Sequence, residues 1–123
     1  MDFVIQVNTA PYQNQSVYTA LEFSRAVLQQ GHQIKRIFFY HEGIYNAFST
    51  TEPPADETNI ITNWSELARH YHLDLLVCIS AAQQRGLKLQ DHSEGSLLAN
   101  GFRIGGLGEM VEAMIEADRL MVF

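Results

Sequence analysis

The chain has 123 residues, 46% of them hydrophobic and 18% charged, with one Cys, and this composition excludes disordered, collagen-like and disulfide-stapled chains. Eight Lys and Arg against 14 Asp and Glu give a formal net charge of -6. This charge disfavours direct nucleic-acid binding, because proteins that bind nucleic acids usually present a basic surface to the phosphates.

The beginning of the chain predicts a strand, a helix and a second strand. Residues 3–7 are apolar and β-branched and run into a turn that contains Pro11, which indicates a buried strand. Residues 16–30 place their apolar side chains on one helical face and end before Gly31, which predicts an amphipathic helix. Residues 33–39 form a second apolar run. A connection of this length implies that the two strands are parallel.

The middle of the chain predicts a loop, a helix and a buried strand. Residues 40–58 have no lasting periodicity, so we expect a loop with one helical turn near Tyr45. Asn63 and Glu66 resemble a capping box that opens a helix ending at about Tyr71. Residues 73–80 are almost continuously apolar, which predicts a central strand of the sheet.

No segment of the sequence suits a membrane span or a signal peptide. The longest apolar run, at residues 75–79, is far shorter than the roughly 18 residues that a spanning helix needs. The first seven residues lack the basic start of a signal peptide. We therefore expect a cytoplasmic protein with no membrane partner.

The rest of the chain continues the alternation of helices and strands. We expect a short helix at 81–85, weakly helical character at 90–98, a helix at 110–117 and a last strand at 120–123. This pattern predicts a single α/β domain over residues 1–123: a three-layer sandwich with a mostly parallel, twisted sheet flanked by helices.

Cys78 is the candidate reactive residue, because it lies near the carboxyl end of the predicted central strand. Ser80 and Gln83 suggest an N-cap for the following short helix. The thiol would then face backbone N–H groups and the positive end of a helix dipole, an arrangement that favours the nucleophilic thiolate. Arg85 would add positive charge from the far end of that helix. The alternative is that Cys78 is a small hydrophobic core residue, and the residue pattern alone leaves both open.

Other catalytic and binding motifs are weaker. No Ser lies in a G-x-S-x-G elbow. His70 and His72 have no neighbouring Cys to complete a zinc set, so we interpret them as a helix-end pair and predict no metal site. The glycines at 105–108 lack both the P-loop Lys and the dinucleotide-binding spacing, which favours backbone packing.

Five aromatic residues lie within residues 38–48, namely Phe38, Phe39, Tyr40, Tyr45 and Phe48. Such clusters are enriched at protein interfaces, which makes Tyr45 and Phe48 candidate interface residues. The alternative is that Phe38 and Phe39 cover the two sheet faces while Tyr45 and Phe48 fold back as a lid.

Several motifs together resemble the DsrE/TusD family of sulfur-relay proteins, nearest to its TusD members. They are Phe-Phe-Tyr-His-Glu-Gly-Ile-Tyr-Asn-Ala at 38–47, Cys-Ile-Ser-Ala-Ala-Gln-Gln-Arg-Gly at 78–86, and Gly-Phe at 101–102 followed by Gly-Leu-Gly at 106–108. The resemblance covers the whole chain. It implies a DsrE-like α/β fold, a sulfurtransferase activity and a persulfide on Cys78.

The resemblance also implies a pathway and partners. Cys78 would accept sulfane sulfur from a TusA-like donor and pass it to a TusE-like acceptor, for the 2-thiolation of the wobble uridine of tRNA. TusB- and TusC-like subunits would complete a heterohexamer, and the tRNA would be touched only by the last enzyme. A DsrE-like role in dissimilatory sulfur oxidation and a role as a non-catalytic assembly subunit are the alternatives.

A single cysteine fits such a relay on chemical grounds. Its thiolate attacks the outer sulfur of a donor persulfide, and an acceptor thiol then attacks the new Cys78 persulfide. This exchange requires no metal or organic cofactor. It does require that the donor and acceptor proteins can reach the Cys78 thiol at the carboxyl end of the strand.

Overall fold

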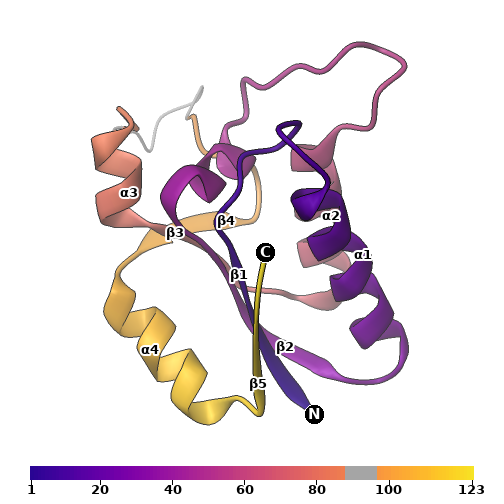
Figure 1. Ribbon diagram of the computed structural model, residues 1–123, viewed down its shortest axis with the longest axis vertical. Helices are drawn as coiled ribbons and strands as arrows, with labels where there is room; N and C mark the ends of the chain where they lie inside the picture. The colour runs from indigo at the N-terminus through magenta and orange to yellow at the C-terminus, as the bar shows by residue number, and fades with distance from the viewer. Residues whose placement is uncertain (88–96) are drawn as a thin grey trace.

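Five parallel strands form a sheet at the centre of the protein, with helices on both faces (Figure 1). The structure is a computed structural model and describes residues 1–87 and 97–123. In chain order the elements are β1 (Asp2–Val7), α1 (Ser16–Gln29), β2 (Gln33–Phe39), the 3₁₀ helix η1 (His41–Ala47), α2 (Ile60–Tyr71), β3 (Leu75–Cys78), α3 (Ile79–Gln84), β4 (Phe102–Gly105), α4 (Leu107–Glu116) and β5 (Arg119–Val122). The predicted α/β sandwich is therefore confirmed.

The strand order is β4-β3-β2-β1-β5, and every neighbouring pair is parallel. The chain thus moves outward from β1 to β4 and then crosses the sheet to add β5 beside β1. Figure 1 shows α1 and α2 on one side of the sheet and α3 and α4 on the other. Because all strands run the same way, their carboxyl ends meet at one edge, where η1, α3 and the start of α4 follow β2, β3 and β4.

The face under α1 and α2 is closed by apolar packing. Trp64 of α2 is fully buried and its ring meets that of Phe39 edge-on, with ring centroids 5.3 Å apart. Val17, Ala20 and Leu21 of α1 are buried on the same side of that helix. The helix ends before Gly31, whose φ of 87° is a left-handed conformation that favours glycine.

Several predicted boundaries were wrong. Helix α2 begins at Ile60, because the side chain of Asn59 accepts a hydrogen bond from the Thr62 N–H at 3.1 Å. The predicted capping residue Asn63 lies inside the helix. Strand β3 is interior and fully buried, but it is shorter than residues 73–80 and β2 occupies the centre of the sheet.

Strand β4, in the last quarter of the chain, was not predicted from the sequence pattern. Strand β4 is four residues long and lies between Gly101 and Gly106, so it is too short and too Gly-flanked to show a period. Most of the weakly helical prediction at 90–98 lies outside the described residues; Leu98 forms an antiparallel bridge with Phe48. No helix in the described part of the chain is long and apolar enough to cross a membrane.

Candidate functional site

Cys78 is the last residue of β3 and the residue from which α3 starts, at the carboxyl edge of the sheet. It pairs in register with Gly105 at the end of β4. The predicted position at a strand end is confirmed. The expectation of a reachable thiol was wrong for this conformation, because Cys78 is only 1% exposed. Helix α3 begins directly at Ile79, next to the buried thiol, and packs against η1.

Tyr40 directly follows β2, the strand that pairs with β3. Within that pairing, Phe38 lies opposite Leu76. Tyr40 has an extended backbone, with φ -126° and ψ 160°, and its ring stacks on Phe38 with centroids 5.7 Å apart. Both rings therefore lie on the sheet face that carries Leu76.

On the other side of Cys78, Gly105 leaves room for a carboxylate. A Cβ atom at position 105 would overlap Oε2 of Glu109 and Cδ1 of Leu76. The carboxylate of Glu109, in the first turn of α4, therefore packs directly on the backbone of the residue that pairs with Cys78. A larger residue at position 105 would require the side chains of Glu109 and Leu76 to shift.

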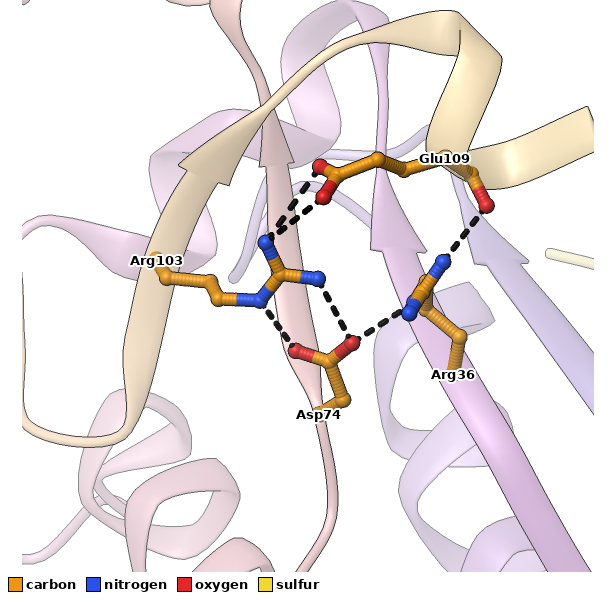
Figure 2. Close-up of polar contacts among 4 residues, drawn as sticks. All are labelled: Arg36, Asp74, Arg103 and Glu109. Atoms are coloured by element: carbon orange, nitrogen blue, oxygen red, sulfur yellow. Dashed lines mark hydrogen bonds and ion pairs between the residues drawn. The ribbon is translucent and has the colours of Figure 1, made fainter. Parts of the chain in front are cut away.

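An ion-pair network holds α4 in this position (Figure 2). Arg103 of β4 donates from Nε and Nη2 to the two carboxylate oxygens of Asp74, at 2.6 and 2.8 Å, and from Nη1 to Glu109 Oε1 at 3.0 Å. Arg36 of β2 donates from Nε to Asp74 at 2.6 Å and from Nη1 to the backbone carbonyl of Glu109 at 2.5 Å. Arg36 and Arg103 thus link Asp74, the residue before β3, to the first turn of α4.

The network also keeps Asp74 in its charged form. Hydrogen bonds from Arg103 lower the pKa of Asp74 below its ordinary value, against the opposing effect of burial, and Arg36 lowers it further. The same contact with Asp74 raises the pKa of Arg103. Asp74 is therefore a carboxylate between two guanidinium groups, which strengthens these hydrogen bonds. No sequence signal pointed to this cluster, because its members lie far apart in the chain and belong to different elements.

Ser80 and Arg85 are not drawn toward the thiol. Ser80 lies in the first turn of α3, is exposed and does not cap the helix, since the cap position is Cys78 itself. The predicted Ser80 cap was wrong because α3 begins earlier than residue 81. Arg85 donates from Nη1 to the carbonyl of Ala81 at 3.2 Å, which directs its guanidinium back along its own helix. Supporting roles for the two side chains stay predictions.

Tyr45 and Phe48 contact each other edge-on, with ring centroids 5.1 Å apart, and both are partly buried against the core. Phe38 and Phe39 are buried on opposite faces of the sheet. This packing agrees with the expectation that the aromatic segment folds back on the sheet. An interface role for Tyr45 and Phe48 stays a prediction.

The histidine pair ends α2, as expected. His72 is its C-cap, with a left-handed φ of 57°, and the ring of His70 lies edge-on to Tyr71. Among residues 1–87 and 97–123, no group of three or more His, Cys, Asp or Glu side chains is placed to hold a metal ion.

Comparison with known proteins gives consistent matches over the full chain. A family model described as the DsrE/DsrF-like family matches residues 1–123. The chain is 46% identical to DsrE of Allochromatium vinosum, in an alignment that covers 100% of this chain and 98% of that protein. It is 34% identical to the sulfurtransferase TusD of Enterobacter sp. and 36% identical to that of Serratia proteamaculans, over 100% of this chain and 100% and 99% of theirs.

A solved structure has the same fold. The crystal structure of the ychN protein from E. coli matches with a TM-score of 0.84, covering 100% of this chain and 99% of that one. The two sequences are 22% identical, so this match supports the arrangement of strands and helices alone.

Proposed function

Because this chain belongs to the DsrE/DsrF-like family and is a sulfurtransferase, we propose that it carries sulfane sulfur as a persulfide on Cys78, in a relay for the 2-thiolation of the wobble uridine of tRNA. The observation that carries the proposal is the position of the chain's one cysteine at the carboxyl end of β3. Ligand and reaction sites of parallel α/β folds gather at this edge.

The transfer consists of two thiol exchanges with no net oxidation. The Cys78 thiolate attacks the outer sulfur of a donor persulfide, so that a new S–S bond forms on Cys78 and the donor leaves as a thiolate. An acceptor thiolate then attacks the outer sulfur of the Cys78 persulfide and regenerates the Cys78 thiolate. The proton of the terminal sulfur travels with that sulfur or exchanges with water, and the electron pairs balance without a cofactor.

The burial of Cys78 fits a protected intermediate. A persulfide is open to oxidation when it is exposed to solvent, and a side chain that is 1% exposed meets few solvent oxidants. Both transfer steps then require that the thiol become exposed when a partner binds, and we propose that α3, which directly follows Cys78, moves to expose it. This helix has only six residues, so the apolar contacts opposing its displacement are few.

The partners follow from the same family resemblance. A TusA-like carrier is the donor, a TusE-like protein is the acceptor, and TusB- and TusC-like chains complete a heterohexamer. The acidic net charge of -6 agrees with a subunit that leaves tRNA binding to the last enzyme of the relay.

Mass spectrometry tests the sulfur-carrying step. The chain is incubated with the persulfide form of a TusA-like carrier, and we expect the wild type to gain one sulfur atom. Cys78→Ser should gain none, while Gln29→Ala, which changes an exposed residue of α1 and keeps the thiol, should be loaded. An unchanged wild-type mass with a competent donor would contradict the proposal.

Alkylation separates a relay thiol from a non-catalytic assembly subunit. Iodoacetamide should modify Cys78 slowly in the isolated chain, because the thiol is buried, and faster in the presence of carrier or acceptor. A thiol that stays inert in every assembled form until the chain unfolds would instead indicate core packing and an assembly role.

A DsrE-like role in dissimilatory sulfur oxidation is the second candidate. The observation that favours it is the 46% identity to DsrE of Allochromatium vinosum, against 34% and 36% for the TusD proteins compared above. The 2-thiouridine content of tRNA in cells lacking this chain distinguishes the two roles. Loss of 2-thiouridine supports tRNA thiolation, whereas a normal content together with impaired sulfur oxidation supports the second role.

A further inference from the structure

The space next to Cys78 on the side of β4 is filled by a side chain from α4. Cys78 pairs with Gly105, at the end of a register that runs from Leu75 to Cys78 without a shift. Paired residues of neighbouring parallel strands direct their Cβ atoms to the same face of the sheet, and such strands lie about 4.8 Å apart. A side chain at position 105 would therefore lie beside that of Cys78.

Glycine leaves this position empty, and the Glu109 carboxylate occupies it. A Cβ atom at position 105 would overlap Oε2 of Glu109 and Cδ1 of Leu76. Leu76 lies two residues before Cys78 in β3, so the two share one face of the sheet. The carboxylate therefore lies on the face of the thiol, in the place that a β4 side chain would fill.

Glu109 is held firmly by its backbone and less firmly by its carboxylate. Its backbone carbonyl accepts a hydrogen bond from Arg36 Nη1 at 2.5 Å. Its carboxylate oxygens share Arg103 Nη1, at 3.0 and 3.3 Å, whereas Asp74 accepts from Nε and Nη2 of the same guanidinium at 2.6 and 2.8 Å. The Glu109 side chain can therefore turn while α4 and the Arg103–Asp74 contact stay in place (Figure 2).

The Glu109 side chain also extends from solvent to a buried position. It is 40% exposed and its partner Arg103 is 43% exposed, while Cys78 is 1% exposed. Ion pairs between exposed side chains contribute little to stability, so little free energy opposes the turning of this carboxylate into water. A Cβ atom at position 105 would fill the space permanently, whereas Glu109 fills it with a group that can move.

We propose that Glu109 controls access to Cys78: its side chain covers the thiol from the side of β4 and turns away when a partner delivers or removes sulfur. This inference rests on the proposed function of Cys78. It is distinct from the movement of α3, because α3 follows Cys78 in the chain and Glu109 belongs to α4. The cover keeps small reagents from the sulfur between the two transfer steps, when a persulfide is open to oxidation.

Two substitutions separate the space that Glu109 fills from its charge. Glu109→Asp keeps the carboxylate and withdraws it from Gly105, whereas Glu109→Gln keeps the length and removes the charge. Iodoacetamide should alkylate Cys78 roughly threefold faster or more in Glu109→Asp, because the rate at a covered site scales with the fraction of time that it is open. Glu109→Gln should stay within about twofold of the wild type, since its amide fills the same space and can accept from Arg103.

Two further variants serve as controls. Glu112→Asp makes the same change at an exposed position of the same helix, and its alkylation rate should equal that of the wild type. Asp74→Ala loosens the ion-pair network but leaves the Glu109 side chain on Gly105. Its rate should rise less than that of Glu109→Asp, although it should lose more free energy of unfolding. Mass spectrometry measures alkylation of the folded chains, and urea denaturation measures their stability.

Three results would overturn this role of Glu109. The first is a Glu109→Asp rate no higher than that of Glu112→Asp. The second is an equal increase in Glu109→Gln, which would assign the effect to charge. The third is a set of rates that follows the free energy of unfolding across the variants, which would assign alkylation to unfolding. A wild type that takes no sulfur from a persulfide-loaded TusA-like carrier would instead refute the proposed function, and the alkylation rates, which need no carrier, report on Glu109 separately.

Discussion

The two faces of the sheet are built in different ways. The face under α1 and α2 is closed by apolar side chains such as Phe39 and the fully buried Trp64. The opposite face holds Cys78, a partly exposed ion-pair network and a helix with a strip of exposed apolar residues. The first face leaves little apolar surface exposed to a partner, whereas the second leaves several large apolar side chains exposed.

This difference separates stability from function along one sheet. Changes on the closed face should cost much free energy of unfolding and should affect transfer only through folding. Changes on the open face should cost less stability, and those at its exposed positions should act on transfer. The following predictions test this separation, beginning with the largest expected loss of stability.

Trp64→Ala should be the most damaging change. Trp64 is 0% exposed, packs on Phe39, and donates from its indole N–H to Asn46 Oδ1 at 3.1 Å. Removal of a buried Trp side chain costs about 3–5 kcal/mol, because it leaves a cavity and an unpaired polar group. Urea denaturation measures the loss, and Trp64→Phe, which keeps a ring, should lose clearly less. A loss under 1 kcal/mol for Trp64→Ala would show that the closed face is not the main source of stability.

Asp74→Ala should cost about 2 kcal/mol, an intermediate amount. It removes a carboxylate that accepts charged hydrogen bonds from Arg36 and Arg103, and each such bond contributes on the order of 1.5–3 kcal/mol before solvent exposure reduces it. Asp56→Ala, at an exposed position between η1 and α2, is the matched control and should change stability little.

The acid dependence of stability tests the same residue. Arg103 and Arg36 lower the pKa of Asp74 in the folded chain, so its contribution is fully present above the unfolded pKa of about 4. It is lost as the pH falls through the lower folded pKa. The wild type should therefore lose stability in acid more steeply than Asp74→Ala. Equal slopes for the two proteins would contradict the role assigned to the network.

The sequence predicted the closed face better than the open one. Helix α1 and strands β1 and β2 could be predicted from their periodic apolar residues and from Gly31. In these elements the apolar residues of the pattern are also the buried ones. The position of Cys78 at a strand end was also predicted. The burial of its thiol was not predicted, nor were the start of α3 at Ile79 and the start of α2, which depends on Asn59 rather than Asn63. Such boundaries are set by single contacts, which periodicity does not report.

The ion-pair network could not have been predicted from the sequence. Arg36, Asp74, Arg103 and Glu109 show no common spacing, and they meet only because the register of β2, β3 and β4 brings them together under α4. The four residues of β4 were themselves missed as a strand, so Arg103 had no predicted place in the sheet. Long-range pairing of this kind is decided by tertiary structure.

Gly105→Ala should cost about 1–2 kcal/mol, because the added methyl would overlap the Glu109 carboxylate and the Leu76 side chain. Both are the ends of flexible side chains and can shift. The double variant Glu109→Ala/Gly105→Ala should lose less free energy of unfolding than the two single variants lose together. A double-mutant cycle by urea denaturation measures this coupling. Strictly additive losses would show that Glu109 does not pack on Gly105.

Ile115→Glu should have the smallest effect on stability, and it is the change that sharpens the comparison most. Ile115 is 79% exposed, so the folded chain gains little from its side chain and the free energy of unfolding should stay within about 0.5 kcal/mol of the wild type. A loss comparable to that of Asp74→Ala would mean that the side chain is buried in the native assembly and stabilises it there. Near-neutral stability with impaired sulfur transfer would instead show that the open face keeps apolar residues at its surface for a transient partner.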